Sequence, residues 1–119
     1  MEPIEINAGA WYLRALRADE RIDDRPALRE GGITDPEYVS TRSAQWADES
    51  NFSWAVCDPV TAELVAEIVV APGSGGSARI SGWSRPGHDA ALEAGLGAVY
   101  RFVEDAFGLR TEPTGGPAS

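Results

Sequence analysis

Hydrophobic and polar positions alternate along three segments of the chain, 10–16, 51–57 and 77–84, and this pattern predicts strands. A fourth segment, 63–70, is an almost continuous apolar run that contains Leu, Val and Ile, which is typical of a buried strand. Residues 58–61 read Asp-Pro-Val-Thr, which is turn chemistry. We therefore expect the second and fourth of these segments to pair as an antiparallel hairpin.

Two other segments have helical spacing. Tyr38, Arg42 and Trp46 recur every four residues, so they share one face of a helix that should begin near the Thr-Asp-Pro of 34–36. Segment 89–107 predicts a longer helix. Its apolar stripe consists of Leu92, Leu96, Val99, Phe102, Val103 and Ala106. The fold class is therefore α+β, with a mainly antiparallel sheet of about four strands and two to three helices.

Arginines recur every four residues between 17 and 30, with acidic residues between them. This pattern predicts a short helix from residue 17 and a second helical turn from Pro26, both on a solvated charged surface. Gly82 inside segment 77–84 indicates either a bulge or a close approach of backbones. Gly95 and Gly97, inside the long helix, indicate close packing against the sheet.

Composition restricts the classes of function. The 119 residues fit one domain, and ten arginines against nineteen acidic residues, with no lysine, give a net charge of −9. We expect no binding to nucleic acid or to a membrane, and an attraction for cationic ligands. Lysine Schiff-base chemistry is excluded. No signal peptide or membrane span is evident, so we expect a cytoplasmic protein.

The chain has one cysteine, Cys57, and one histidine, His88. One cysteine excludes an intramolecular disulfide and a cysteine zinc cluster, and we expect no metal site. Cys57 lies at the turn end of a predicted strand with no base beside it, so we interpret it as a packing residue. We assign residues 1–110 to one folded domain. Residues 111–119, which hold two prolines and two glycines, are expected to be a disordered tail.

Three stretches together resemble the GNAT N-acetyltransferase superfamily, and within it the RimJ/RimL-like branch. They are Tyr-Leu-Arg-Ala-Leu at 12–16 followed by Arg-Ala-Asp, the hairpin of 52–68, and the run from Gly82-Trp-Ser to Leu-Glu-Ala at 92–94. Their order and spacing cover about residues 10–110. The resemblance implies an acetyltransferase that moves acetyl from acetyl-CoA to a primary amine, without a metal.

In that family, the loop between the fourth strand and the long helix wraps the pyrophosphate of acetyl-CoA, where the N–H groups of a helix N-terminus suit an anion. By position, Gly87 matches the first glycine of the family motif, and Ala91 matches its alanine. Pro86 stands where the motif has arginine, and Asp89 stands where it has its second glycine. The implied cofactor-binding residues are Trp83, Ser84, Gly87, His88, Asp89, Ala90 and Ala91.

These departures leave alternatives open. The carboxylate of Asp89 brings a negative charge to the place where phosphate should approach, or it caps the helix and occupies the N–H groups that the cofactor needs. His88 either supplies a compensating cation or is an exposed turn residue. For catalysis, the amine would attack the thioester directly, and a carboxylate or water would take its proton. Glu67 is the interior carboxylate that we nominate, unless it points to solvent.

The resemblance stops near Arg110, whereas the family continues with a fifth strand, a further helix and two more strands. We therefore interpret the chain as truncated relative to the family, with Pro113 and Pro117 preventing the tail from forming the fifth strand. An unpaired edge at 77–84 would follow, and it predicts a homodimer or a partner protein there. The alternative function is a degenerate, non-catalytic GNAT-like module for binding or dimerisation.

Overall fold

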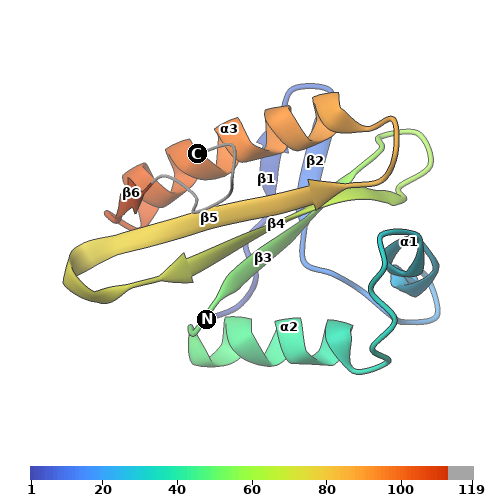
Figure 1. Ribbon diagram of the computed structural model, residues 1–119, viewed down its shortest axis with the longest axis horizontal. Coiled ribbons are helices and arrows are strands. Elements are labelled where there is room, and N and C mark those ends of the chain that lie inside the picture. The colour runs from blue at the N-terminus through green and yellow to red at the C-terminus, as the bar shows by residue number, and fades with distance from the viewer. Residues whose placement is uncertain (113–119) are drawn as a thin grey trace.

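One six-stranded sheet organises the computed structural model, which describes residues 1–112 (Figure 1). The strands, in their order across the sheet, are β1 (Ile6–Ala8), β2 (Trp11–Arg14), β3 (Phe52–Cys57), β4 (Leu64–Pro72), β5 (Ser77–Ser84) and β6 (Arg110–Glu112). Neighbouring strands are antiparallel except β5 and β6, which run parallel. The predicted α+β class and the hairpin of β3 and β4 are confirmed.

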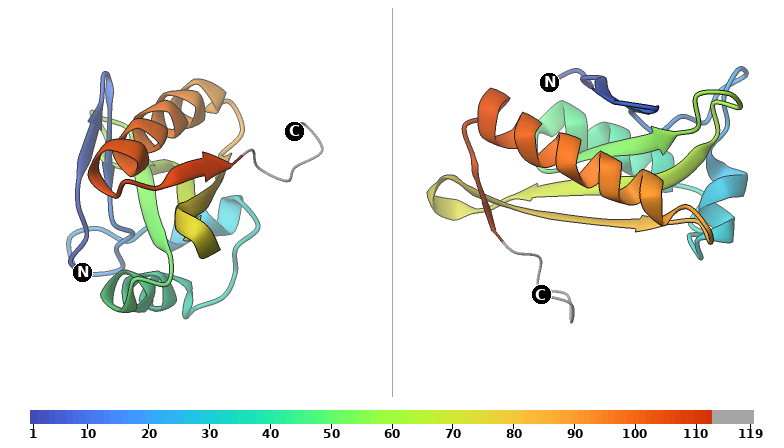
Figure 2. Two further views of the ribbon diagram at one scale, coloured as in Figure 1. Left: turned by 90° about the vertical axis from the view of Figure 1, so that its left-hand side faces the viewer. Right: turned by 90° about the horizontal axis from the view of Figure 1, so that it is seen from above.

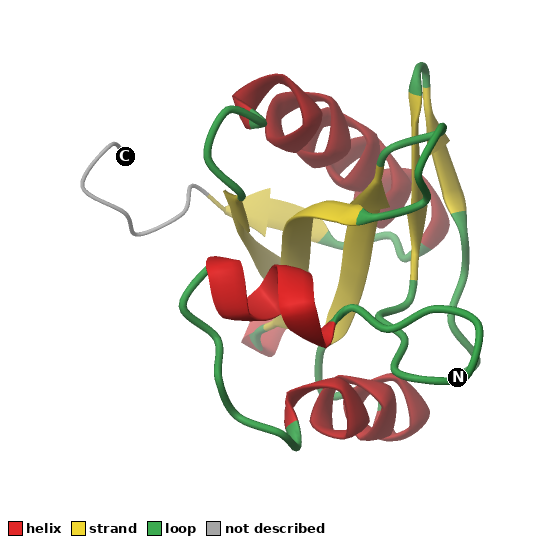
Figure 3. Ribbon diagram, turned by 90° about the vertical axis from the view of Figure 1, so that its right-hand side faces the viewer, coloured by secondary structure: helices red, strands yellow, loops and turns green. Residues whose placement is uncertain are grey.

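Helices lie on both faces of this sheet. α3 (Asp89–Ala106) crosses one face, while α1 (Arg25–Glu30) and α2 (Tyr38–Asp48) lie on the other side (Figures 2 and 3). The larger core lies mainly between α3 and the sheet and includes Trp46 of α2, and a smaller one joins α1 to β3 and β4. Among the described residues, no helix has the length and the apolar character needed to cross a bilayer.

Of the two glycines inside α3, one allows the helix to lie directly on the strands. A Cβ at Gly95 would come within 2.6 Å of Ile68 Cδ1 and 2.7 Å of Val56 Cγ2, so the predicted close packing is confirmed there. At Gly97 a Cβ would have only Arg101 nearby, at 3.6 Å, so that part of the prediction is wrong.

Gly82 marks a close approach and not a bulge in the pairing of β4 with β5. The register runs without a break from Ala66↔Ser84 to Pro72↔Ala78. A Cβ at Gly82 would lie 2.8 Å from both the Glu67 carbonyl oxygen and Leu92 Cδ1. The register shift of the sheet lies instead in β3, between Val56 and Cys57.

The predicted helix from residue 17 is wrong. Asp19 Oδ1 accepts the N–H groups of Arg21 at 2.9 Å and Ile22 at 3.1 Å, which closes a turn in place of a helix. α1 begins only at Arg25, with Pro26 in its first turn, as that proline predicts. α2 likewise begins later than expected, because Asp35 Oδ1 accepts the N–H of Glu37 in the turn that precedes it.

The end of the described chain corrects a second expectation. Thr111 and Glu112, assigned to a disordered tail, belong to β6, which pairs with Ser77–Arg79. The boundary placed at residue 110 therefore falls inside a strand, and the prediction that no strand follows the long helix is wrong. The rest of the predicted tail, 113–119, lies outside the described residues.

Candidate functional site

A tight turn joins β5 to α3. The carbonyl oxygen of Arg85 accepts the N–H of His88 at 3.0 Å, with Pro86 and Gly87 as the two central residues. Gly87 has a φ of +83°, the left-handed conformation that the third position of a type II turn requires. Pro86 and Gly87 thus fix the direction in which α3 begins.

The first turn of α3 presents free backbone donors. The carbonyl oxygen of His88, the N-cap residue, accepts the N–H groups of Ala91 and Leu92 at 3.1 and 3.3 Å. Within residues 1–112, no hydrogen-bond acceptor lies on the N–H groups of Asp89 or Ala90. These groups carry the partial positive charge of the helix N-terminus, so the site can take an anion.

Asp89 is the first residue of α3, and the expectation that it caps the helix is wrong. Its Oδ1 accepts a hydrogen bond from Ser84 Oγ at 3.2 Å, and the N-cap position belongs to His88. Asp89 and Ala90 are exposed, whereas Ala91 is completely buried beneath the helix. The carboxylate therefore sits beside the free N–H groups without using them.

Trp83 does not join the other predicted cofactor-binding residues. Successive side chains of a strand face opposite sides, so Ser84 faces α3 while Trp83 faces α1 and α2. The Trp83 indole N–H donates to Glu67 Oε1 at 2.9 Å, and its ring lies against the backbone of Gly31. The structure thus groups Trp83 with Glu67.

Glu67 is completely buried in a network of side-chain donors, so the alternative that it points to solvent is wrong. Tyr38 Oη donates to Oε1 at 2.6 Å, and Arg42 Nε donates to Oε2 at 3.1 Å. Arg42 Nη2 also donates to Tyr38 Oη at 2.7 Å. Together with Trp83, these residues tie α2 to β4 and β5; we call them the Glu67 network.

The Glu67 network is built for charge compensation and not for proton transfer. Both carboxylate oxygens are engaged, and the carboxylate is closed to solvent. Burial, followed by the hydrogen bond to Glu67, raises the pKa of Tyr38 to about 12, so this phenol stays protonated near neutral pH and does not accept a proton. The Glu67 carboxylate is therefore closed to an amine in the surrounding solvent.

Arg85 is the arginine nearest in sequence to the turn, and its guanidinium is held elsewhere. It donates to Glu30 Oε2 at 2.7 Å, to Glu63 Oε1 at 3.1 Å and to the Leu64 carbonyl oxygen at 3.1 Å. It therefore adds no free cation at the start of α3. His88, half-buried there, is the other basic side chain of the turn.

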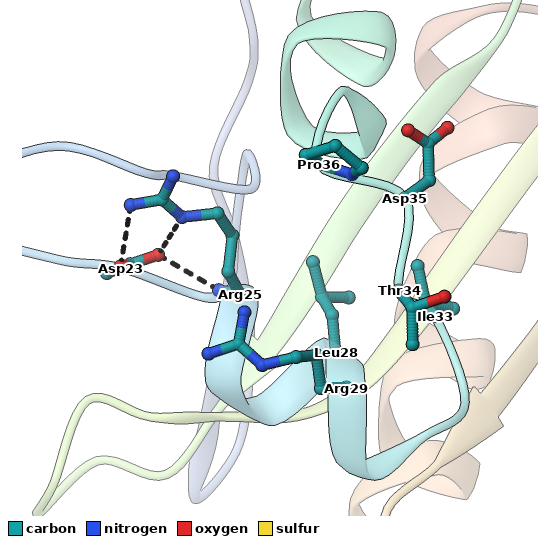
Figure 4. Close-up of a pocket in the computed structure, with 8 residues that line it drawn as sticks. All are labelled: Asp23, Arg25, Leu28, Arg29, Ile33, Thr34, Asp35 and Pro36. Atoms are coloured by element: carbon teal, nitrogen blue, oxygen red, sulfur yellow. Dashed lines mark hydrogen bonds and ion pairs between the residues drawn. The ribbon is translucent and has the colours of Figure 1, made fainter.

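A separate cavity of about 200 Å³ lies between α1 and the segment that leads to α2 (Figure 4). It has an apolar floor of Leu28 and Ile33, and its rim includes Arg25, which binds Asp23 through Nε at 2.8 Å and Nη2 at 2.9 Å. None of the predicted site residues lines it.

Sequence reasoning missed one buried ion pair. Arg14 binds Asp24 through two hydrogen bonds of 2.9 Å, and both side chains are at least nine-tenths buried. Cys57 is buried nearby; burial raises the pKa of its thiol to about 12, in keeping with a packing residue. Among the described residues, no group of three or more histidine, cysteine or acidic side chains could hold a metal ion.

Comparison with known proteins gives a fold. No family model and no curated protein matches the sequence. Among solved structures, a Vibrio cholerae protein described as a ribosomal-protein-serine acetyltransferase superposes with a TM-score of 0.79 at 16% identity, over 98% of this chain and 77% of its own. Mycobacterium smegmatis RimJ, in complex with CoA-disulfide, superposes with a TM-score of 0.72 at 20% identity, over 98% of this chain and 71% of its own.

A GNAT-family acetyltransferase from Bacillus anthracis gives a TM-score of 0.69 at 17% identity, over 98% of this chain and 76% of its own. The chain has the GNAT fold. β5 corresponds to the fourth strand expected from the sequence, and β6 is a further strand that follows the long helix. Because β6 covers Ser77–Arg79, the free edge predicted for 77–84 is reduced, within the described residues, to Ile80–Ser84.

Proposed function

We propose that this protein is an N-acetyltransferase that binds acetyl-CoA at the junction of β5 and α3. The observation that carries the proposal is the arrangement of this junction. The edge of β5 is open at Ile80–Ser84 within the described residues, and it leads through the turn at Gly87 to the free N–H groups of Asp89 and Ala90. An extended amide chain fits such an edge, and a pyrophosphate fits such a helix start.

Transfer proceeds by direct attack. The acceptor amine, in its neutral form, attacks the thioester carbonyl carbon, the bond from carbon to sulfur breaks, and CoA leaves as the thiolate. Because Glu67 is closed to solvent, water takes the proton that the amine releases. The net charge of −9 raises the local concentration of cationic acceptors, so we propose a primary amine on a basic molecule as the acceptor.

The carboxylate of Asp89 sets the affinity of this site. It is exposed and lies at the helix start, where the pyrophosphate should approach. A like charge there opposes the attraction of the free N–H groups, each effect being worth about 0.3–1 kcal/mol at an exposed helix terminus. We therefore expect weak binding of acetyl-CoA by the natural chain and tighter binding once this charge is removed.

Thermal unfolding with and without acetyl-CoA tests this. A ligand at a hundred times its Kd stabilises a protein by about 2.7 kcal/mol, which raises the Tm by several degrees. Asp89→Asn should increase the rise in Tm at a fixed concentration of acetyl-CoA. Asp105→Asn, which changes the net charge equally at the other end of α3, is the matched control and should behave like the natural chain. If neither the natural chain nor Asp89→Asn responds at millimolar acetyl-CoA, the proposal fails.

The second candidate is a non-catalytic binding module of GNAT fold. Two observations favour it: the Asp89 carboxylate beside the helix start, and the closed Glu67 network. Mass spectrometry of a lysine-containing peptide incubated with protein and acetyl-CoA separates the two. Acetylated peptide above the protein-free reaction supports the enzyme; a Tm response without acetylation supports the module.

A further inference from the structure

The open edge of β5 at Ile80–Ser84 is also suited to pairing with a further strand, independently of acetyl transfer. Five consecutive residues lack a strand partner on the β6 side among residues 1–112, while on the other side they pair with β4 throughout. Ser81 and Gly82 are exposed. Unpaired N–H and C=O groups along such an edge are a template for an added strand.

This edge lacks the features with which proteins usually block one. Its register with β4 is unbroken, so no bulge turns it away, and it contains neither lysine nor proline. Among the described residues, the edge is therefore accessible to an extended polypeptide at Ser81–Ser84, whereas Ile80 is completely buried.

The negative charge at one end of the edge favours a polypeptide with a basic side chain at that end. Ser84 ends β5, and its hydroxyl donates to the exposed carboxylate of Asp89 at 3.2 Å, the only hydrogen bond that Asp89 Oδ1 makes within the described residues. Arg85, the next residue, is turned toward Glu30 and Glu63. A chain laid along Ile80–Ser84 thus meets, at the Ser84 end, the exposed carboxylate of Asp89, which forms no salt bridge within the described residues.

We propose that the Ile80–Ser84 edge binds an extended peptide as an additional strand, with a lysine or arginine of the peptide against Asp89. A second copy of this chain fits less well, because two chains that each carry a net charge of −9 repel one another. The peptide and acetyl-CoA use the same edge and helix start, so the two exclude each other. The inference does not depend on acetyl transfer.

Amide hydrogen exchange followed by NMR tests the proposal on the full chain. The probe is an end-blocked hexapeptide of alternating threonine and valine that ends in lysine. Matched controls end in glutamate, or carry proline at two central positions. The lysine peptide should slow exchange at Ile80–Ser84, and the proline peptide should not, since proline cannot donate to a ladder. Asp89→Asn should weaken binding of the lysine peptide about three-fold, and it should not weaken binding of the glutamate peptide.

Three results would overturn the proposal. The first is no added protection at Ile80–Ser84 with millimolar lysine peptide. The second is equal binding of the lysine and glutamate peptides. The third is strong protection, without peptide, of those amides of Ile80–Ser84 that point away from β4, either in a dimer seen by sedimentation or in a monomer, because the edge would then already be covered. An absence of acetyl-CoA binding would leave the proposal intact, which separates its failure from that of the proposed enzyme.

Discussion

Glu67 places a carboxylate in the interior of the sheet, and three side chains compensate it. Removing one partner of a buried ion pair generally costs far more than removing an exposed pair, because the remaining charge loses its solvation without a partner. Arg42 keeps 18% of its side chain exposed, which lessens that penalty. The Glu67 network therefore contributes to stability mainly by leaving no donor unpaired at the contact of α2 with the sheet.

Glu67→Gln tests the role of the Glu67 network. The amide keeps the shape but loses the charge and presents a donor to Tyr38 or Arg42, so the free energy of unfolding should fall by about 3 kcal/mol. Glu63→Gln is the matched control; its carboxylate is 60% exposed against Arg85 and should cost less than about 1 kcal/mol. Urea unfolding measures both. Equal, small losses would contradict a compensated interior charge.

Cys57 predicts how stability depends on alkaline pH. Burial raises its pKa from about 9 to about 12 in the folded protein, so between these values the unfolded chain has lost a proton that the folded chain keeps. The stabilisation is complete below pH 9 and is lost as pH rises toward 12, by about 1.4 kcal/mol for each pH unit. Cys57→Ala should make the free energy of unfolding fall less steeply between pH 9 and 10, where Tyr38, whose pKa rises from 10 to about 12 on folding, contributes less than Cys57. An unchanged slope would show that the thiol is not buried.

Some of these environments follow from local patterns and others do not. Strand alternation places Glu67 on the face opposite Ile68, and the four-residue spacing of Tyr38 and Arg42 places both on one helix face. Neither pattern reveals that the two faces meet, because that contact joins residues 25 to 29 positions apart. The expectation that Asp89 caps the helix is wrong for a related reason, because its carboxylate accepts a hydrogen bond from Ser84, across the turn.

At the scale of elements, the contact of α3 with the sheet depends on one glycine and not on the other. Gly95→Ala places a methyl group against Val56 and Ile68, so α3 must shift, at a cost of about 1–3 kcal/mol. Gly97→Ala meets no such obstacle and should stabilise the helix by up to about 1 kcal/mol. Urea unfolding of both variants gives the comparison. A loss of stability for both, or for neither, would be inconsistent with this packing.

The elements that escaped prediction are the short ones. β1 and β6 have three residues each, too few for a periodic signal, and pairing with β2 and β5 defines them. β6 also pairs with residues about thirty positions earlier, so its partner is not evident locally. The regular spacing of the arginines predicts a helix in 17–24 that does not form. Hydrogen bonds from the backbone to a carboxylate hold a turn there and outweigh the helical spacing.

At the scale of the whole molecule, the sheet and α3 bring together features that favour ligands of opposite charge. The open edge at Ile80–Ser84 and the start of α3 favour an extended amide chain with an anion at its end. The net charge of −9 and the carboxylate of Asp89 favour a cationic ligand. Each of the two proposed ligands, acetyl-CoA and a basic peptide, satisfies one of these demands, and we expect them to compete for the same edge.

The most direct measurement is an NMR titration of the full chain with acetyl-CoA, read as chemical-shift changes of the backbone amides. If acetyl-CoA binds at the junction of β5 and α3, the changes should concentrate at Ile80–Ser84 and at Gly87–Ala91. Asp89→Asn should saturate at a lower acetyl-CoA concentration than the natural chain. Shifts confined to the cavity beside α1, or no shifts at millimolar acetyl-CoA in either protein, would contradict binding at this junction.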